Sequence, residues 1–143
     1  MLVIQICDFS KFKSGLMASA TLVLVAVVSL GSPLHAGTPE GVWLTEPDAK
    51  GQRAHVVSSR CGNSFCGTIT EVFDRNGAPV AAPTVGQRVF WDMQAKGDTF
   101  SGRAYVPAHR REYAARMQVN GNQMTVKGCL GPVCQSQKWR RVR

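Results

Sequence analysis

The stretch Arg111-Glu112-Tyr113-Ala114-Ala115-Arg116-Met117-Gln118-Val119 alternates between two kinds of side chain. Its odd-numbered positions from Tyr113 onward are apolar, and its even-numbered positions are mostly polar. Successive side chains of a β-strand point to opposite faces of a sheet, so this spacing predicts a strand with one buried and one solvated face. Asn120-Gly121-Asn122 follows directly and is typical of a tight turn into a second strand, Gln123 to Gly128.

The rest of the chain after Ala36 carries the same kind of signal. Short runs rich in β-branched and aromatic residues are separated by turn residues, and no apolar spacing of three and four residues is sustained. We therefore expect an all-β chain. The predicted strands cover residues 41–46, 53–60, 66–73, 87–93, 99–106, 111–119, 123–128 and 134–142.

The connections between these runs are short, apart from a longer loop from Asp74 to Gly86. Sequential antiparallel strands with short links most simply close into an up-and-down barrel, because closure removes exposed strand edges. We predict a small eight-stranded antiparallel barrel, with a β-sandwich as the alternative. A barrel of this size is just wide enough to be filled by its side chains or to hold one small ligand, and the sequence leaves both open.

Residues 1–36 have the pattern of a cleaved secretory signal peptide. Lys11 and Lys13 precede the apolar run Leu16 to Leu30, and Ala36 offers a small residue for cleavage. The run is shorter than the roughly 20 residues that a spanning helix needs, which disfavours an uncleaved anchor. We expect a single mature domain, residues 37–143, that is periplasmic or secreted and has no transmembrane segment.

The chain is basic, with 17 Lys and Arg residues against 9 Asp and Glu residues and a net charge of +8. Such a surface favours anionic neighbours, which in a cell envelope are lipid head groups, acidic polysaccharides or acidic proteins. Nucleic acid is not an expected partner, because it is scarce outside the cytoplasm. The alternative is a basic surface that is only solvated. The same choice applies to the terminal Arg140-Arg141-Val142-Arg143.

Two C-x-x-x-x-C units, Cys61 to Cys66 and Cys129 to Cys134, leave an even number of cysteines once Cys7 is removed with the signal peptide. If Asn63-Ser64 and Gly131-Pro132 are two-residue turns, the cysteines of each unit face each other across a hairpin at disulfide distance. This geometry favours local Cys61–Cys66 and Cys129–Cys134 bridges. Loop-closure entropy alone would favour a crossed arrangement.

Two functional readings of the cysteines are weaker. Zinc sites usually space paired ligands by two to four residues, and a redox pair normally uses C-x-x-C beside a helix. We expect structural disulfides, no metal and no cofactor.

The sequence resembles a bacterial envelope family catalogued as domain of unknown function 2147. The similarity spans most of the mature chain and is carried by several short motifs. These are Gly41-Val42-Trp43, Cys61-Gly62 to Cys66-Gly67-Thr68-Ile69, Phe90-Trp91, Gly102 to Pro107 with Tyr113, Lys127-Gly128-Cys129, and Cys134-Gln135-Ser136-Gln137-Lys138-Trp139. The resemblance implies a small exported β-barrel with no established activity.

A looser likeness to calycin barrels, such as lipocalins, points to the same fold. Those barrels carry Gly-x-Trp in the first strand, and its indole packs against an arginine of the last strand. The likeness implies that Trp43 closes one end of the barrel by packing on Arg140 or Arg141, a contact worth about 1 kcal/mol.

Catalytic chemistry is poorly represented. His55 lies in a predicted strand and His109 in a basic turn, and neither has a nucleophile at a fixed spacing. Glu112 and Tyr113 follow His109, but adjacent strand residues point to opposite faces and do not simply converge. We expect no enzymatic activity.

Aromatic and basic residues share several predicted strands, and such sets bind planar or anionic ligands. The candidate ligand-binding residues are Trp91, Arg103, Tyr105 and Tyr113. The alternative for all four is core and rim packing. Two functions stay open: a binding module for a small apolar or anionic molecule, which predicts an open barrel mouth, and a structural or interaction protein of the envelope, which predicts a filled barrel and a basic exterior.

Overall fold

The computed structural model describes residues 37–142, and the predicted signal peptide, residues 1–36, lies outside the described residues. Within the described part of the chain, no helix has the length and apolar character needed to cross a membrane. The strands are β1 (Gly41–Leu44), β2 (Arg53–Cys61), β3 (Ser64–Phe73), β4 (Pro79–Val80), β5 (Arg88–Lys96), β6 (Thr99–Val106), β7 (Arg111–Asn120), β8 (Gln123–Leu130) and β9 (Val133–Arg141).

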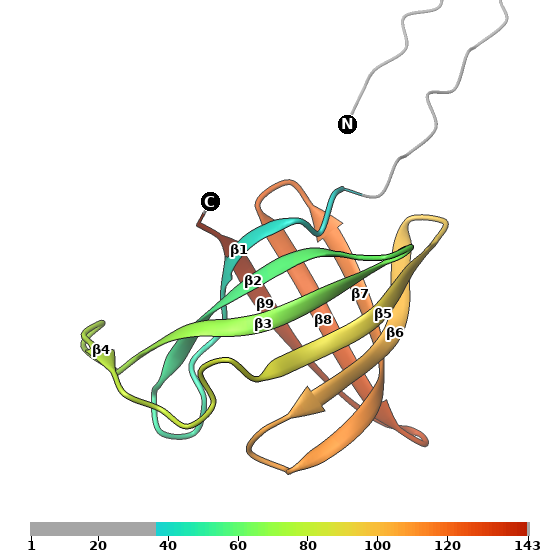
Figure 1. Cartoon of the computed structure of the whole chain (residues 1–143). Coiled ribbons are helices and arrows are strands. Elements are labelled where there is room, and N and C mark those ends of the chain that lie inside the picture. The colour runs from blue at the N-terminus through green and yellow to red at the C-terminus, as the bar shows by residue number, and fades with distance from the viewer. Residues whose placement is uncertain (1–36, 143) are drawn as a thin grey trace, which may run out of the picture. The chain divides into compact units, whose positions relative to one another are not determined.

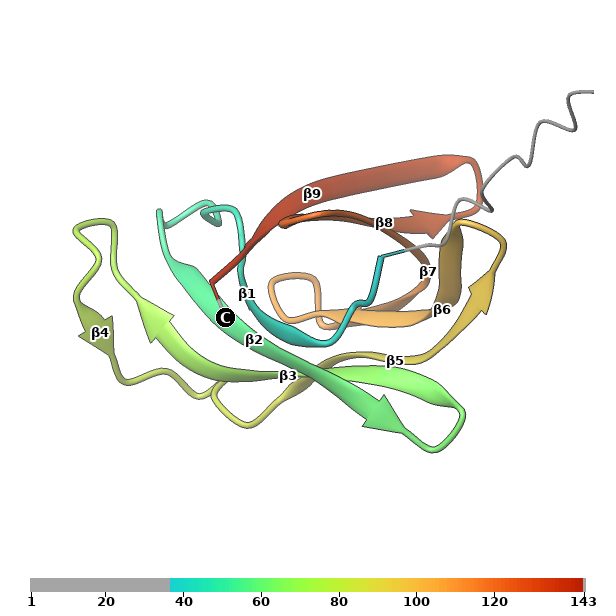
Figure 2. The same ribbon diagram turned by 90° about the horizontal axis from the view of Figure 1, so that it is seen from above.

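Eight of these strands form a closed antiparallel barrel (Figures 1 and 2). Each strand pairs with the next one along the chain, except that β3 pairs with β5 as well as with the two-residue β4. The β1–β9 pairing joins the two ends of the meander through two residue pairs, so the sheet closes on itself. The predicted up-and-down barrel is therefore confirmed, and the alternative β-sandwich is excluded.

The two ends of the barrel differ in their connections. The β1–β2, β3–β5, β6–β7 and β8–β9 connections all lie at one end, which is the lower end in Figure 1 and is called the loop end below. The opposite end carries the β2–β3, β5–β6 and β7–β8 turns together with the start of β1 and the end of β9. β4 lies within the longest connection, beside the end of β3.

Large side chains fill the interior of the barrel. Trp43, Phe90, Met93, Met117 and Met124 are each at most 1% exposed and belong to one continuous core. The alternation predicted for residues 111–119 is present, because Ala115, Met117 and Val119 are buried and the residues between them are exposed. The interior around these core residues is filled, whereas Gln135 and Gln137, on the same face of β9 as the buried Trp139, are exposed.

The register of β5, which the sequence did not determine, contains a β-bulge. Between Trp91 and Gln94, two residues of β5 lie opposite one residue of β6, Gly102. Only glycine fits there, because an added Cβ would lie 2.6 Å from the backbone oxygens of both Trp91 and Asp92. The bulge turns Met93 into the core.

The β2–β3 turn differs by one residue from the predicted one. Cys61 pairs with Ser64, so the turn residues are Gly62 and Asn63 rather than Asn63 and Ser64. Gly62 has a φ of 64°, a left-handed conformation that glycine adopts without steric cost. In consequence Cys66 lies opposite Ser59 rather than opposite Cys61.

Candidate functional site

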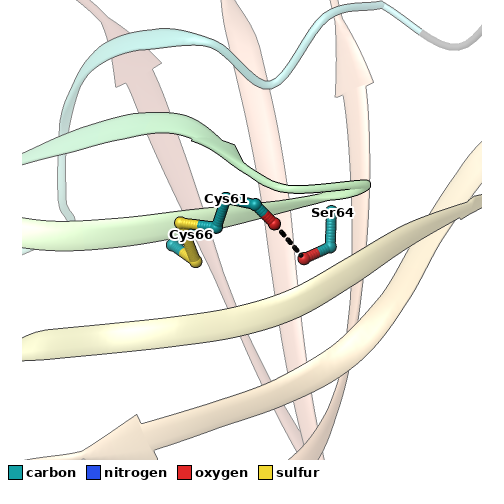
Figure 3. The surroundings of a disulfide bond; sticks show 3 residues. All are labelled: Cys61, Ser64 and Cys66. Carbon is teal, nitrogen blue, oxygen red and sulfur yellow. Dashed lines mark hydrogen bonds between the residues drawn. A yellow bond between two sulfur atoms is a disulfide. The ribbon is translucent and has the colours of Figure 1, made fainter.

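Both predicted disulfides are present, with different geometries. Cys129 and Cys134 are direct cross-strand partners with a Cα–Cα distance of 4.1 Å. Cys61 and Cys66 are diagonal neighbours with a Cα–Cα distance of 5.9 Å, because of the shifted turn. In that hairpin the Ser64 hydroxyl donates a hydrogen bond to the Cys61 carbonyl at 3.1 Å (Figure 3). Each bridge joins the two strands of a single β-hairpin, and the two bridges are called the hairpin clips below.

A cationic hollow lies on the outer wall of the barrel, across β5 to β9. Its volume is about 490 Å³. The polar lining comes from Lys96, Ser101, Arg116 and Lys127, and the Cys129–Cys134 bridge borders it. None of its lining residues is acidic.

Strand register explains how these side chains come together. Arg116 of β7 lies opposite Ser101 of β6 on one side and opposite Lys127 of β8 on the other. The three residues therefore form a row across neighbouring strands, and Arg116 and Lys127 are exposed. Small residues in the adjoining row, such as Ala114, leave space beside the longer cations.

Carboxylates neutralise other cations of the barrel but not those of the hollow. In residues 37–142 the ion pairs that involve arginine are Arg60–Glu40 and Arg103–Glu112. Lys96, Arg116 and Lys127 belong to none of them. A hollow with three cations and a hydroxyl suits a phosphate- or carboxylate-bearing group.

The predicted ligand-binding residues divide between two faces. Trp91 and Arg103 are cross-strand partners on the outer wall, and Tyr105 lies on that wall opposite Glu112. The Arg103 guanidinium forms an ion pair with Glu112, so its charge already has a partner. These three residues do not line the cationic hollow.

Tyr113 lies on the interior side near the loop end, opposite Ala104. Its hydroxyl is 2.8 Å from Nδ1 of His109, and the two rings meet edge to face. Glu112 points to the outer wall, as the alternation of the strand requires. The structure therefore joins His109 with Tyr113 and leaves Glu112 apart from them.

Trp43 closes the end opposite the loop end together with Arg141. The Arg141 guanidinium lies 4.2 Å from the centre of the Trp43 ring. The same guanidinium donates hydrogen bonds to the backbone oxygens of Thr38 and Glu40, and the Trp43 indole donates one to the Pro39 oxygen at 2.8 Å.

The register selects Arg141 over its neighbour Arg140 for this role. Trp43 pairs with Arg141, whereas Arg140 pairs with Leu44 and points to the opposite face. Arg140 instead lines a second open hollow of about 450 Å³ near the β7–β8 turn, together with Lys138.

Sequence reasoning did not name Lys96, Ser101, Arg116 or Lys127 as site residues. A signal was available for Arg116, which occupies a polar position of the alternating stretch 111–119, whereas Lys96 lies outside the predicted strands. That signal does not align neighbouring strands, and the row across β6, β7 and β8 depends on that alignment.

In residues 37–142, no group of three or more His, Cys, Asp or Glu side chains is placed to hold a metal ion. His55 is hydrogen-bonded to Glu71 at 2.9 Å and packs edge to face on Phe73. The four cysteines of the described residues are all in disulfides.

Comparison with known proteins agrees with the fold. A solved structure described as protein HP1028 from Helicobacter pylori, belonging to the lipocalin family, superposes with a TM-score of 0.58 at 15% identity. The match covers 73% of this chain and 82% of that one. At this identity the likeness shows a lipocalin-type barrel and nothing about a ligand.

No curated protein matches this sequence. The family model described as "uncharacterized protein conserved in bacteria (DUF2147)" matches residues 41–141, from the first strand of the barrel to the last. This match confirms the family resemblance carried by the tryptophan and cysteine motifs. The chain is therefore a member of the DUF2147 family.

Proposed function

We propose that this chain is an exported interaction module of the bacterial cell envelope that binds an anionic partner through the cationic hollow on its outer wall. The role is binding rather than catalysis. Export is supported by the two disulfides, which persist in oxidising compartments, and by the signal-peptide pattern of residues 1–36.

The observation that carries the proposal is the row of unpaired cations across β7 and β8. Arg116 and Lys127 are direct cross-strand neighbours. Like charges placed opposite each other destabilise a sheet, so an anion bound between them relieves a cost that the free protein bears. A binding site is a reason for keeping two such cations side by side.

The filled interior supports an external rather than an internal ligand. Trp43, Phe90 and Met124 occupy the barrel interior, where an eight-stranded barrel has room for at most one small ligand, and each is fully buried. A ligand on the barrel axis would have to displace these side chains. The hollow on the outer wall needs no such rearrangement.

The test uses inositol hexakisphosphate, a compact polyanion without an apolar part, and isothermal titration calorimetry. We expect binding by the oxidised protein that weakens as salt screens the charges. The Arg116→Gln/Lys127→Gln variant should bind at least tenfold more weakly, because each charged hydrogen bond contributes about 1.5–3 kcal/mol.

A matched control is Lys50→Gln/Arg75→Gln, which removes the same charge from exposed turns away from the hollow. It should bind nearly as the wild type does. Equal losses in the two double variants would mean that net charge alone attracts the polyanion, and the hollow would then not be the site.

A second candidate function is a small-molecule site at the barrel mouth, favoured by the His109–Tyr113 pair at the loop end. Native mass spectrometry of protein purified gently from its own envelope separates the two. A stoichiometric small molecule that is lost in Tyr113→Phe and retained in Arg116→Gln/Lys127→Gln would favour the mouth over the hollow.

A further inference from the structure

The β8–β9 hairpin exposes an apolar pair at its tip. Leu130 and Val133 are cross-strand partners, and their side chains are 49% and 67% exposed. The two-residue turn between them is Gly131-Pro132, both exposed. Neither side chain belongs to the hydrophobic core cluster of the barrel, so the exposed part of the pair is available to an apolar phase.

Within the described residues, most of the large exposed apolar side chains lie toward the loop end. Four large hydrophobic side chains of the described residues are exposed: Val57, Val85, Leu130 and Val133. Val57 lies on the barrel wall in β2, Val85 lies in the β3–β5 connection, and Leu130 and Val133 are the strand residues that flank the β8–β9 turn. In Figure 1 these connections form the lower end of the barrel, with the β8–β9 turn at the right.

Cations flank the apolar tip. Lys127 lies three residues before Leu130 on the same strand, which is about 10 Å at a rise of about 3.3 Å per residue. The β6–β7 turn, at the same end, adds the exposed Arg110, and the exposed Arg111 begins β7 directly after it. Neither arginine belongs to an ion pair of the described residues.

We propose that the loop end docks on an anionic lipid bilayer, with Leu130 and Val133 inserted and Lys127, Arg116 and Arg110 among the lipid phosphates. Interfacial segments bury their apolar face about 5–10 Å into the boundary between head groups and acyl chains. A tip at that depth places Lys127, about 10 Å behind it, at the level of the phosphates.

This inference rests on the proposed function, because it names the bilayer surface as the source of the anionic groups that the cationic hollow binds. The hollow and the tip are continuous: the Cys129–Cys134 bridge borders the hollow, and the apolar pair follows it directly. The bridge also holds the two strands together at the base of the tip, which limits the entropy lost on insertion.

The experiment is co-sedimentation of the oxidised protein with two kinds of vesicle. One contains equal parts of phosphatidylglycerol and phosphatidylcholine, and the other contains phosphatidylcholine alone. We expect binding to the anionic vesicles only. Leu130→Ser/Val133→Ser should lower that affinity at least tenfold, since two apolar side chains no longer leave water, and Val57→Ser should leave it unchanged.

Insertion of the hairpin tip into the bilayer is measured separately from affinity. Tryptophan fluorescence of Val133→Trp should shift to shorter wavelength on anionic vesicles, and that of Val57→Trp should not. Wild-type affinity in the tip variant, or the absence of a shift in Val133→Trp, would overturn the insertion. Binding to an acidic protein, without binding to either kind of vesicle, would also overturn the proposed insertion.

The two proposals fail differently. The tip variant keeps both cations of the hollow, so it should bind inositol hexakisphosphate as the wild type does. Polyanion binding without vesicle binding leaves the cationic hollow as a site and removes the bilayer as its partner. If the wild-type protein does not bind inositol hexakisphosphate, the proposed function itself is wrong.

Discussion

At the scale of single residues, glycine positions decide where the barrel wall tolerates a side chain. Gly102 and Gly128 both lie on interior positions, and each pairs with Ala115 of β7. The added Cβ meets backbone oxygens at 2.6 Å at Gly102, but only the Tyr113 side chain at 3.4 Å at Gly128. The first contact is with rigid backbone and the second is ordinary van der Waals distance.

We therefore expect Gly102→Ala to lower the free energy of unfolding by about 3 kcal/mol, because the β5 bulge must shift. Gly128→Ala, in the same row of the barrel, should change it by less than about 1 kcal/mol. Urea unfolding followed by tryptophan fluorescence measures both. Similar losses in the two variants would contradict the role given to the bulge.

At the scale of elements, the two disulfides, each a hairpin clip, close loops of equal length. Both bridges span a sequence separation of 5, although one joins direct partners and the other diagonal ones. The entropy that a bridge removes from the unfolded chain depends on loop length rather than on register. The two clips should consequently stabilise the fold to the same degree.

Replacing either pair by serine should lower the free energy of unfolding by about 2 kcal/mol. The paired variants are Cys61→Ser/Cys66→Ser and Cys129→Ser/Cys134→Ser, each compared with the oxidised wild type by urea unfolding. A loss above about 4 kcal/mol in one pair only would mean that its bridge also holds native packing. The equality expected from loop length would then be wrong.

At the scale of the whole molecule, eight strands and a closed barrel could be predicted because turn residues and β-rich runs recur along the chain. The disulfide pairing could also be predicted, since the hairpins bring the cysteines of each unit close together. The bulge at Gly102 and the turn at Gly62-Asn63 could not, because both depend on tertiary register. The cationic hollow was missed for the same reason: its row spans three strands.

The end opposite the loop end offers a sharp comparison, because two adjacent arginines have different surroundings. Arg141 lies over Trp43 and bonds two backbone oxygens, whereas Arg140 is exposed on the other face. Arg141→Ala should lower the free energy of unfolding by about 2 kcal/mol, and Arg140→Ala by less than about 0.5 kcal/mol. Thermal and urea unfolding check this difference. A larger effect of Arg140→Ala would reverse the assignment.

The β1–β9 pairing has a consequence for folding. It consists of two residue pairs, Trp43 with Arg141 and Leu44 with Arg140, which are the most distant partners along the barrel sequence. The other barrel pairings join strands that are close in sequence, although β4 and its loop lie between β3 and β5, while this seam must wait for β9. A chain emerging from its N-terminus therefore stays an open sheet, with β1 exposed as an edge, until its final strand is released.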